Sequence, residues 1–245
     1  MRASLLDEYR GEVERIFGDD LVSLTVYGAH AGEEPAPGAE AAVLIVVREL
    51  SRAALQGYRD VAHRFARRGI PAPPILTEAF LRESADVFPL EFLGMAEKRR
   101  VLAGRDVVAE LAITTRNLRH QVEFELKGKL LALRRMYMQT FGRKELAQLI
   151  LSTVGPLVSV ARGLLLLADR RPGAPPSVPP HDKEEVVAEI EKRFAVSLHS
   201  VREAVVARKA GAMSPSRAEE IFLPYLEEAA RLCALSDRFP AGDDG

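Results

Sequence analysis

Apolar residues follow two different spacings along this chain of 245 residues. In the first half, two continuous apolar runs of strand length occupy residues 21–27 and 42–47. Such runs are typical of strands that are covered on both faces. Apolar positions every three to four residues, at residues 4–17 and 51–68, predict amphipathic helices. A short strand at residues 75–76 follows, so that strand, helix and strand alternate as in a helix-covered sheet.

Beyond residue 114 the apolar spacing is helical almost throughout. It predicts four helices, at residues 117–141, 143–170, 183–210 and 214–237. Short loops between such helices favour an antiparallel bundle. The first of them carries one apolar stripe, formed by Leu118, Val122, Leu130, Leu133, Tyr137 and Phe141.

One stretch of the second helix, residues 146–168, has the length of a membrane span and a single charge, Arg162. A charge in the middle of a bilayer is costly, and several polar residues also interrupt the stretch. An apolar helix is equally what the centre of a bundle requires. We therefore interpret this stretch as a buried bundle helix and expect no membrane association.

These patterns predict an α+β protein with two domains. The first, residues 1–113, is expected to hold a mixed sheet with helices, and the second, residues 114–240, an all-α helical bundle. A tail at residues 241–245 is expected to be disordered. The net charge of −1 gives no strong nucleic-acid signal. The single cysteine, Cys233, and an N-terminus without a secretory pattern predict a cytoplasmic location.

The loop between the two apolar runs carries the candidate chemistry. It opens with Gly28-Ala29-His30 and leads into the second run through Glu40-Ala41-Ala42. This layout resembles the nucleotidyltransferase superfamily with its polymerase-β-like fold. In that family a strand leads into Gly-Ser, and Asp-x-Asp opens the next strand. Here Gly28-Ala29 takes the place of Gly-Ser, and Glu40-Ala41-Ala42 that of Asp-x-Asp. Val101-Leu102-Ala103-Gly104 is similar to a Val-Leu-Tyr-Gly segment of the same family.

The resemblance implies a degenerate metal site. Nucleotidyl transfer normally uses two Mg²⁺ ions about 3.5–4 Å apart, which carboxylates hold against the triphosphate. Glu40 is the one metal-ligand candidate, because Ala42 cannot bind a cation. We therefore expect an inactive protein without a cofactor, which binds a nucleotide, another anion or a protein partner. The alternative is an active enzyme in which Glu40 and another carboxylate hold Mg²⁺ and a nucleotide passes to a small molecule or protein.

Six residues are candidates for binding phosphate. They are Gly28, Ala29 and His30 in the loop, and Arg116, Arg119 and Lys127 in the second half. Backbone amides of a glycine turn attract anions. Residues 116–144 hold eight basic residues and two acidic ones, and the three named cations share one helix face. The competing interpretation is a solvated helix face on which Glu123 and Lys127 pair.

A second alternative function rests on Arg193 and His199. Their spacing is similar to the Arg-x(4–6)-His motif of the HEPN ribonucleases, within a predicted helix. Phe194 follows the arginine, where those proteins usually have a polar residue. Six residues of helix also turn the two side chains about 240° apart. Both observations favour a chance pairing.

Overall fold

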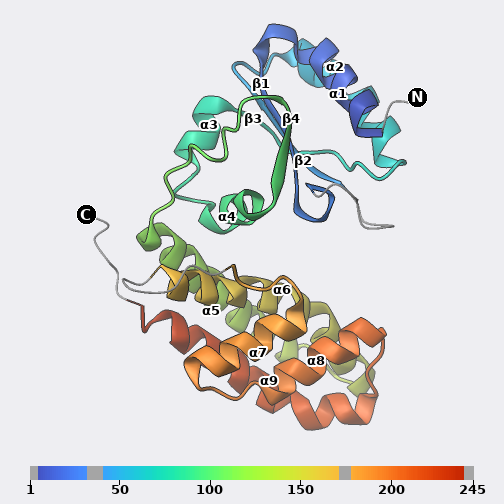
Figure 1. Cartoon of the computed structure of the whole chain (residues 1–245). Helices are drawn as coiled ribbons and strands as arrows, with labels where there is room; N and C mark the ends of the chain where they lie inside the picture. Colours follow the sequence, from blue (N-terminus) through green and yellow to red (C-terminus); the bar gives the residue numbers. More distant parts are fainter. Residues whose placement is uncertain (1–4, 32–40, 171–177, 240–245) are drawn as a thin grey trace. The chain divides into compact units, whose positions relative to one another are not determined.

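The computed structural model describes residues 5–31, 41–170 and 178–239, and the chain divides into two units, Met1–Ile113 and Thr114–Gly245. The predicted α+β class is confirmed, since the first unit holds a sheet and the second is helical (Figure 1). The predicted tail at residues 241–245 lies outside the described residues.

A mixed four-stranded sheet forms the centre of the first unit. Its strands are β1 (Leu21–Tyr27), β2 (Ala42–Val47), β3 (Ile75–Thr77) and β4 (Arg99–Gly104), in the order β3-β2-β1-β4. β1 is antiparallel to β2 and to β4, whereas β2 and β3 are parallel. The two apolar runs are therefore adjacent central strands with the predicted bounds. Gly28 follows the end of β1, and Ala42 begins β2.

Helices cover both faces of this sheet (Figure 1). They are α1 (Leu5–Phe17), α2 (Arg52–Ala66), α3 (Glu78–Glu83) and α4 (Pro89–Glu97). On one face, Tyr9 of α1 and Phe65 of α2 pack with Leu24 and Val26. On the other face, α3, α4 and residues 105–113 pack around Leu44 and Val46. Double coverage explains why β2 is apolar on both sides. In β1, the two buried polar side chains, Ser23 and Thr25, hydrogen-bond to each other at 3.0 Å.

Gly104 ends β4 in a conformation that only glycine adopts easily. Its φ is +76°, and a Cβ atom there would lie 2.0 Å from the carbonyl oxygen of Val22. The backbone at residues 104–105 lies this close to β1 because Arg105 N donates to the same carbonyl oxygen at 3.1 Å. The last residue of the Val101–Gly104 segment is thus fixed by close packing of two backbones.

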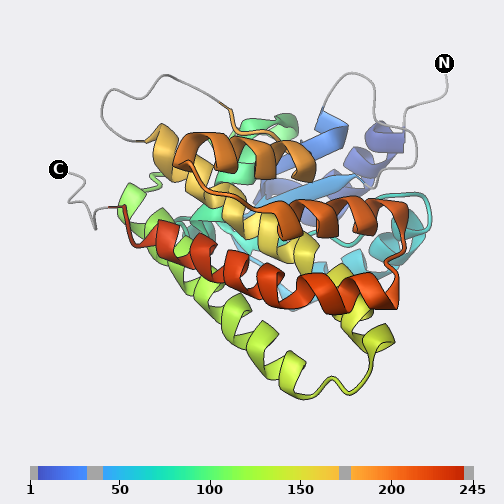
Figure 2. The same cartoon turned by 90° about the horizontal axis from the view of Figure 1, so that it is seen from below.

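The second unit is a bundle in which one helix contacts all the others. The helices are α5 (Thr115–Met138), α6 (Arg143–Asp169), α7 (Lys183–Phe194), α8 (His199–Ala210) and α9 (Pro215–Ser236). α6 packs against each of the other four, and α9 runs alongside α6 and α5 (Figure 2). Of the predicted apolar stripe on α5, Leu118, Val122, Leu130 and Leu133 are buried, and Tyr137 stacks on buried Phe222 of α9. The prediction is wrong for Phe141, which lies beyond α5 and is 93% exposed.

α6 has the length and apolar composition of a membrane span, and it is the one such helix found in the described parts of the chain. Within the bundle, 67% of its most apolar window is buried. The guanidinium of Arg162 binds two backbone carbonyls within the same unit. Its Nε donates to Pro180 O at 2.8 Å and its Nη2 donates to Pro179 O at 2.7 Å. The central helix thereby anchors the segment that enters α7.

The single helix predicted at residues 183–210 is wrong. Ala195 adopts a left-handed conformation, with φ +52°, and separates α7 from α8. The carboxylate of Glu228, in α9, accepts hydrogen bonds from Ser200 N at 3.1 Å and Val201 N at 2.8 Å. These amides belong to the first turn of α8, where no residue of the same helix can accept from them. A distant side chain therefore stabilises a helix start that local spacing does not reveal.

Candidate functional site

The turn after β1 lies at the predicted phosphate-binding position. Gly28 has φ +72° and opens a short 3₁₀ turn, Gly28–Ala31, which lies beside α4, β2 and β4. Gly28 N donates to Lys98 O at 2.9 Å. This amide is therefore engaged within the first unit, and an anion at the turn has to meet amides that follow Gly28. The side chains of Ala29 and His30, and all of Glu40, lie outside what the structure describes.

Three residues form a row across the sheet at this end. Tyr27 of β1 pairs with Ala42 of β2 on one side and with Arg99 of β4 on the other. Directly paired residues of adjacent strands point to the same face. This face is the one covered by α3 and α4. Burial raises the pKa of the Tyr27 phenol above its usual range, so this side chain stays neutral at physiological pH.

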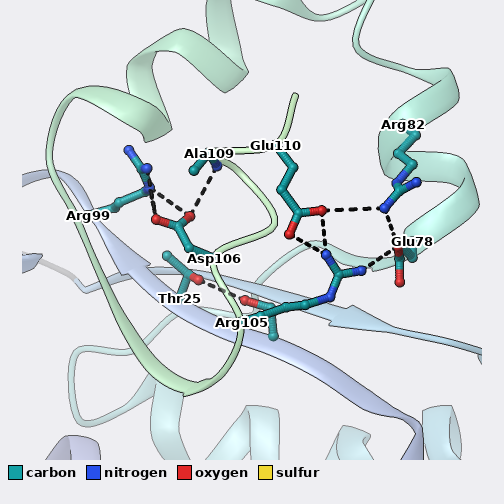
Figure 3. A network of polar contacts seen from close by, with 9 residues as sticks. Thr25, Glu78, Arg82, Arg99, Arg105, Asp106, Ala109 and Glu110 are labelled. Carbon is teal, nitrogen blue, oxygen red and sulfur yellow. Dashed lines mark hydrogen bonds and ion pairs between the residues drawn. The ribbon is translucent and has the colours of Figure 1, made fainter. Parts of the chain in front are cut away.

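Arg99 extends from this row to a carboxylate on the same unit (Figure 3). Its Nε donates to Asp106 Oδ1 at 2.9 Å and Oδ2 at 3.0 Å, and its Nη1 donates to Ala96 O. Asp106 Oδ1 also accepts from Ala109 N at 3.1 Å. The hydrogen bonds from Arg99, above all, hold the pKa of Asp106 below its usual range. Asp106 is thus an ionised carboxylate whose oxygens are already bound by donors.

The donors near this row do not fit a magnesium ion. Mg²⁺ prefers carboxylate and water oxygens, whereas the row offers a methyl group, a phenol and a guanidinium. Within the described ranges, no three His, Cys, Asp or Glu side chains gather closely enough to hold a metal ion. The resemblance places a metal ligand at Ala42, and the methyl group of this residue offers no oxygen to a cation.

Basic residues adjoin the glycine turn instead. Lys98 and Arg100 are exposed on either side of Arg99, and the carbonyl of Lys98 binds Gly28. Sequence reasoning missed this group, although three consecutive basic residues immediately before the Val101–Gly104 segment are a visible signal. Two adjacent exposed cations give this end of the sheet a local positive potential.

A second polar network lies in the same unit, beyond the opposite ends of the strands (Figure 3). Arg105 forms ion pairs with both Glu78 and Glu110. Arg82 contacts the same two carboxylates, at 2.7 Å and 3.4 Å. Hydrogen bonding from Arg105 is the main cause of a lowered pKa at Glu78. Two cations and two anions pair with one another here, so the network ties residues 105–113 to α3.

The three basic candidates of the second unit lie on α5. Glu123 pairs with Arg119 at 3.1 Å and with Lys127 at 2.5 Å, and Lys127 also contacts Asp237 at 3.0 Å. The predicted Glu123–Lys127 pair is therefore confirmed. Arg116 is exposed in the first turn of the helix. Glu123 thus partly neutralises both Arg119 and Lys127.

The two residues of the HEPN-like motif do not share a helix. Arg193 lies in the last turn of α7 and pairs with Glu189 at 2.6 Å and with Asp169. His199 begins α8, is 75% exposed and lies 4.0 Å from Glu203. The prediction that one helix carries both is wrong, because the chain breaks at Ala195. Each side chain has its own acidic neighbours, Glu189 and Asp169 for Arg193 and Glu203 for His199.

Comparison with known proteins identifies the fold. No protein-family model matches this chain, and no curated protein sequence does. A solved structure of spectinomycin adenyltransferase AAD(9) from Enterococcus faecialis, with ATP and spectinomycin, is similar with a TM-score of 0.56. The match covers 96% of this chain and 98% of that chain, at 11% sequence identity. The nucleotidyltransferase-like fold expected from the sequence is therefore confirmed, over both units.

Proposed function

We propose that this nucleotidyltransferase-like protein binds a nucleotide or another phosphate-bearing anion without transferring a nucleotide. The observation that carries the proposal is the row of Ala42, Tyr27 and Arg99 at the end of the sheet. Metal-dependent transfer requires carboxylates that hold two cations against the triphosphate. An alanine at the position of a ligand removes one of them. Transfer then lacks its main means of neutralising charge at the leaving group.

The chemistry left at this end of the sheet still favours anions. Exposed Lys98 and Arg100 adjoin the turn that follows Gly28. Attraction by such exposed charges does not need a divalent cation and is screened over about 8 Å at physiological ionic strength. The likeness to an adenyltransferase solved with ATP favours a nucleotide as the anion. We also propose a cytoplasmic location, where nucleotides are abundant.

A second candidate function is favoured by one specific observation. The likeness extends over both units of a protein whose structure holds ATP and spectinomycin. An active enzyme of this kind would move a nucleotide from a triphosphate to a small molecule, with Glu40 as a metal ligand. This candidate and the first make opposite predictions about magnesium.

Calorimetric titration of the purified full chain with ATP separates the two candidates. We expect ATP to bind equally in Mg²⁺ and in EDTA, to bind more weakly as salt is raised, and to release no pyrophosphate with spectinomycin as acceptor. Binding that requires Mg²⁺, with pyrophosphate release that Glu40→Gln abolishes, would establish the second candidate. Absence of ATP binding in both buffers would reject nucleotide binding.

Charge-matched variants locate the anion. We expect Lys98→Gln with Arg100→Gln to weaken ATP binding by about tenfold, because each exposed charge contributes up to about 1 kcal/mol. Arg59 of α2 and Arg67, the residue that caps its C-terminus, are exposed on the first unit, and the same double change there removes equal charge. This control is expected to bind as the wild type does. Equal losses in both pairs would show that net charge, and not the turn, attracts the ligand.

The basic candidates of α5 are tested by replacing Arg116, Arg119 and Lys127 together with Gln. We expect a smaller loss than at Lys98 and Arg100, because Glu123 already neutralises two of the three cations. If the triple variant loses all ATP binding, the anion site lies on α5 and not at the end of the sheet.

A further inference from the structure

The outer surface of α5 carries an exposed apolar stripe. Phe124, Leu131 and Met138 are 72%, 64% and 80% exposed. They are spaced seven residues apart, which returns each to nearly the same helix face and gives a stripe about 21 Å long. We call these three residues the α5 stripe. Large apolar side chains that gather on one face, in contrast to scattered ones, mark interaction sites.

The surface beside the α5 stripe is hollowed. One depression is lined by Leu131, Ala132, Arg135, Met136 and Gln139. A second one, of about 110 Å³, lies between α5 and α6 and is lined mostly by apolar atoms. The two share Ala132 and Met136, and the second reaches Pro156 of α6. Protruding side chains next to hollows are the features that a partner helix packs against.

Unneutralised positive charge borders the α5 stripe. Arg119, Lys127 and Lys129 of the same helix each pair with a glutamate. Arg134 and Arg135 are exposed, and neither forms an ion pair with any residue in the described part of the chain. The stripe therefore has two exposed cations beside its centre that form no ion pair with the residues the structure describes.

The charges disfavour a second copy of this chain as the occupant. In an antiparallel pairing centred on Leu131, Arg135 of one copy would lie opposite Lys127 of the other, because both lie four residues from the centre. Lys127 is already paired with Glu123 and Asp237, so Arg135 would gain no acidic partner there. In a parallel pairing, Arg134 of one copy would lie opposite Arg134 of the other, and Arg135 opposite Arg135. Like charges at a helix–helix interface oppose association. An acidic segment meets neither obstacle.

We propose that the α5 stripe binds an acidic amphipathic helix of a partner protein. The partner's apolar residues, at helical spacing, pack on Phe124, Leu131 and Met138 and enter the hollow at Ala132 and Met136. Its flanking Asp and Glu side chains pair with Arg134 and Arg135. This is the helix-in-groove mode of recognition, in which apolar anchors supply affinity and rim charges select the partner.

Two designed peptides test the proposal on the full chain by fluorescence anisotropy. Both carry Leu at heptad a and d positions over three heptads, and their flanking positions are all Glu in one and all Lys in the other. We expect the Glu peptide to bind at least about tenfold more tightly than the Lys peptide. Its Glu side chains pair with Arg134 and Arg135, whereas the Lys side chains of the other peptide are repelled by them. Equal affinity for both peptides, or tighter binding of the Lys peptide, would overturn the proposal.

Surface variants assign the binding to the α5 stripe. Leu131→Ser with Phe124→Ser is expected to weaken the Glu peptide by at least about tenfold, because two anchors are removed. Leu223→Ser, at a residue 53% exposed on α9, is the matched control and should bind normally. Arg134→Glu with Arg135→Glu should reverse the preference between peptides. All of these side chains are exposed, so circular dichroism should show an unchanged fold.

Three further outcomes would each overturn the proposal. Leu131→Cys should react quickly with a maleimide, whereas native Cys233 is buried and burial raises its pKa to about 11. An unreactive Leu131→Cys would show that the stripe is already covered in the full chain. Dimerisation that Leu131→Ser abolishes would make a second copy the occupant. The third outcome is that a 20-nucleotide poly(U) binds more tightly than the Glu peptide does. If that binding is lost on removal of Arg134 and Arg135 but is unchanged in Leu131→Ser, the surface would be assigned to RNA.

Discussion

Replacing Glu228 by Gln should destabilise the second unit more than any other change of one side-chain atom on α9. Glu228 is 4% exposed, and each of its carboxylate oxygens accepts from a backbone amide at the start of α8. Glutamine keeps one acceptor oxygen and presents an amide donor to the other N–H group. One of the two amides of Ser200 and Val201 is then buried without an acceptor.

The expected loss follows from these contacts. A hydrogen bond to a charged group contributes about 1.5–3 kcal/mol. A negative charge at a helix N-terminus adds about 0.3–2 kcal/mol. Because one hydrogen bond survives, we expect a net loss of about 2–3 kcal/mol. For a unit of this size, 1 kcal/mol corresponds to about 3–4 °C, so the melting temperature should fall by about 6–12 °C.

Scanning calorimetry of the full chain measures this shift, and Glu227→Gln is its control. Glu227 is the exposed neighbour of Glu228 and loses the same charge. The control should stay within about 0.5 kcal/mol of the wild type, as surface substitutions usually do. Hydrogen exchange adds a local readout, since the Ser200 and Val201 amides should lose protection in Glu228→Gln before the centre of α6 does. Equal melting temperatures for the two variants would refute the reasoning.

Two further predictions concern the first unit. Gly104→Ala forces a positive φ and a Cβ atom 2.0 Å from Val22 O, so we expect a loss of about 3–5 kcal/mol in urea unfolding; Gly11→Ala, in a helix with open space, should be neutral or slightly stabilising. A Gly104→Ala variant as stable as Gly11→Ala would contradict the close approach of β4 to β1. Asp106→Asn should destabilise at pH 7, and its difference from wild type should disappear as the pH falls through the lowered folded pKa of Asp106. The sign follows because a carboxyl whose folded pKa is depressed stabilises above its unfolded pKa and loses that contribution in acid. A difference that persists unchanged at pH 2 would show that charge pairing with Arg99 is not its cause.

Local sequence signals predicted the elements whose stability is local. The bounds of β1 and β2 match the two apolar runs, because both strands are buried on both faces and end at turn residues. The helix starts predicted at Ser51 and Ser214 were equally visible. Each of these side chains accepts from the backbone amide three residues later, at 3.1–3.2 Å. A capping residue and its helix are neighbours in sequence, so one window contains the whole interaction.

Elements that depend on distant residues were not predicted. The break between α7 and α8 is stabilised by Glu228, which follows the amides of Ser200 and Val201 by 28 and 27 residues. β4 is an edge strand with mixed composition, and its place beside β1 decides that Arg99 joins the row with Tyr27. No spacing rule gives that pairing. The sequence predicted where on the sheet the candidate site lies. It did not predict that Lys98 and Arg100 lie beside the site, because this depends on the order of the strands.

The contact between Arg162 and the entry to α7 has a consequence for which mutations the chain tolerates. Arg162 binds the carbonyl oxygens of residues 179 and 180 and not their side chains. Every amino acid supplies the same carbonyl, so substitutions at these two positions can keep the contact intact. No other residue type offers two rigidly spaced donors from the middle of a buried helix. We therefore expect positions 179 and 180 to tolerate many amino acids and position 162 to tolerate very few. A library of variants that covers all three positions would measure this difference directly.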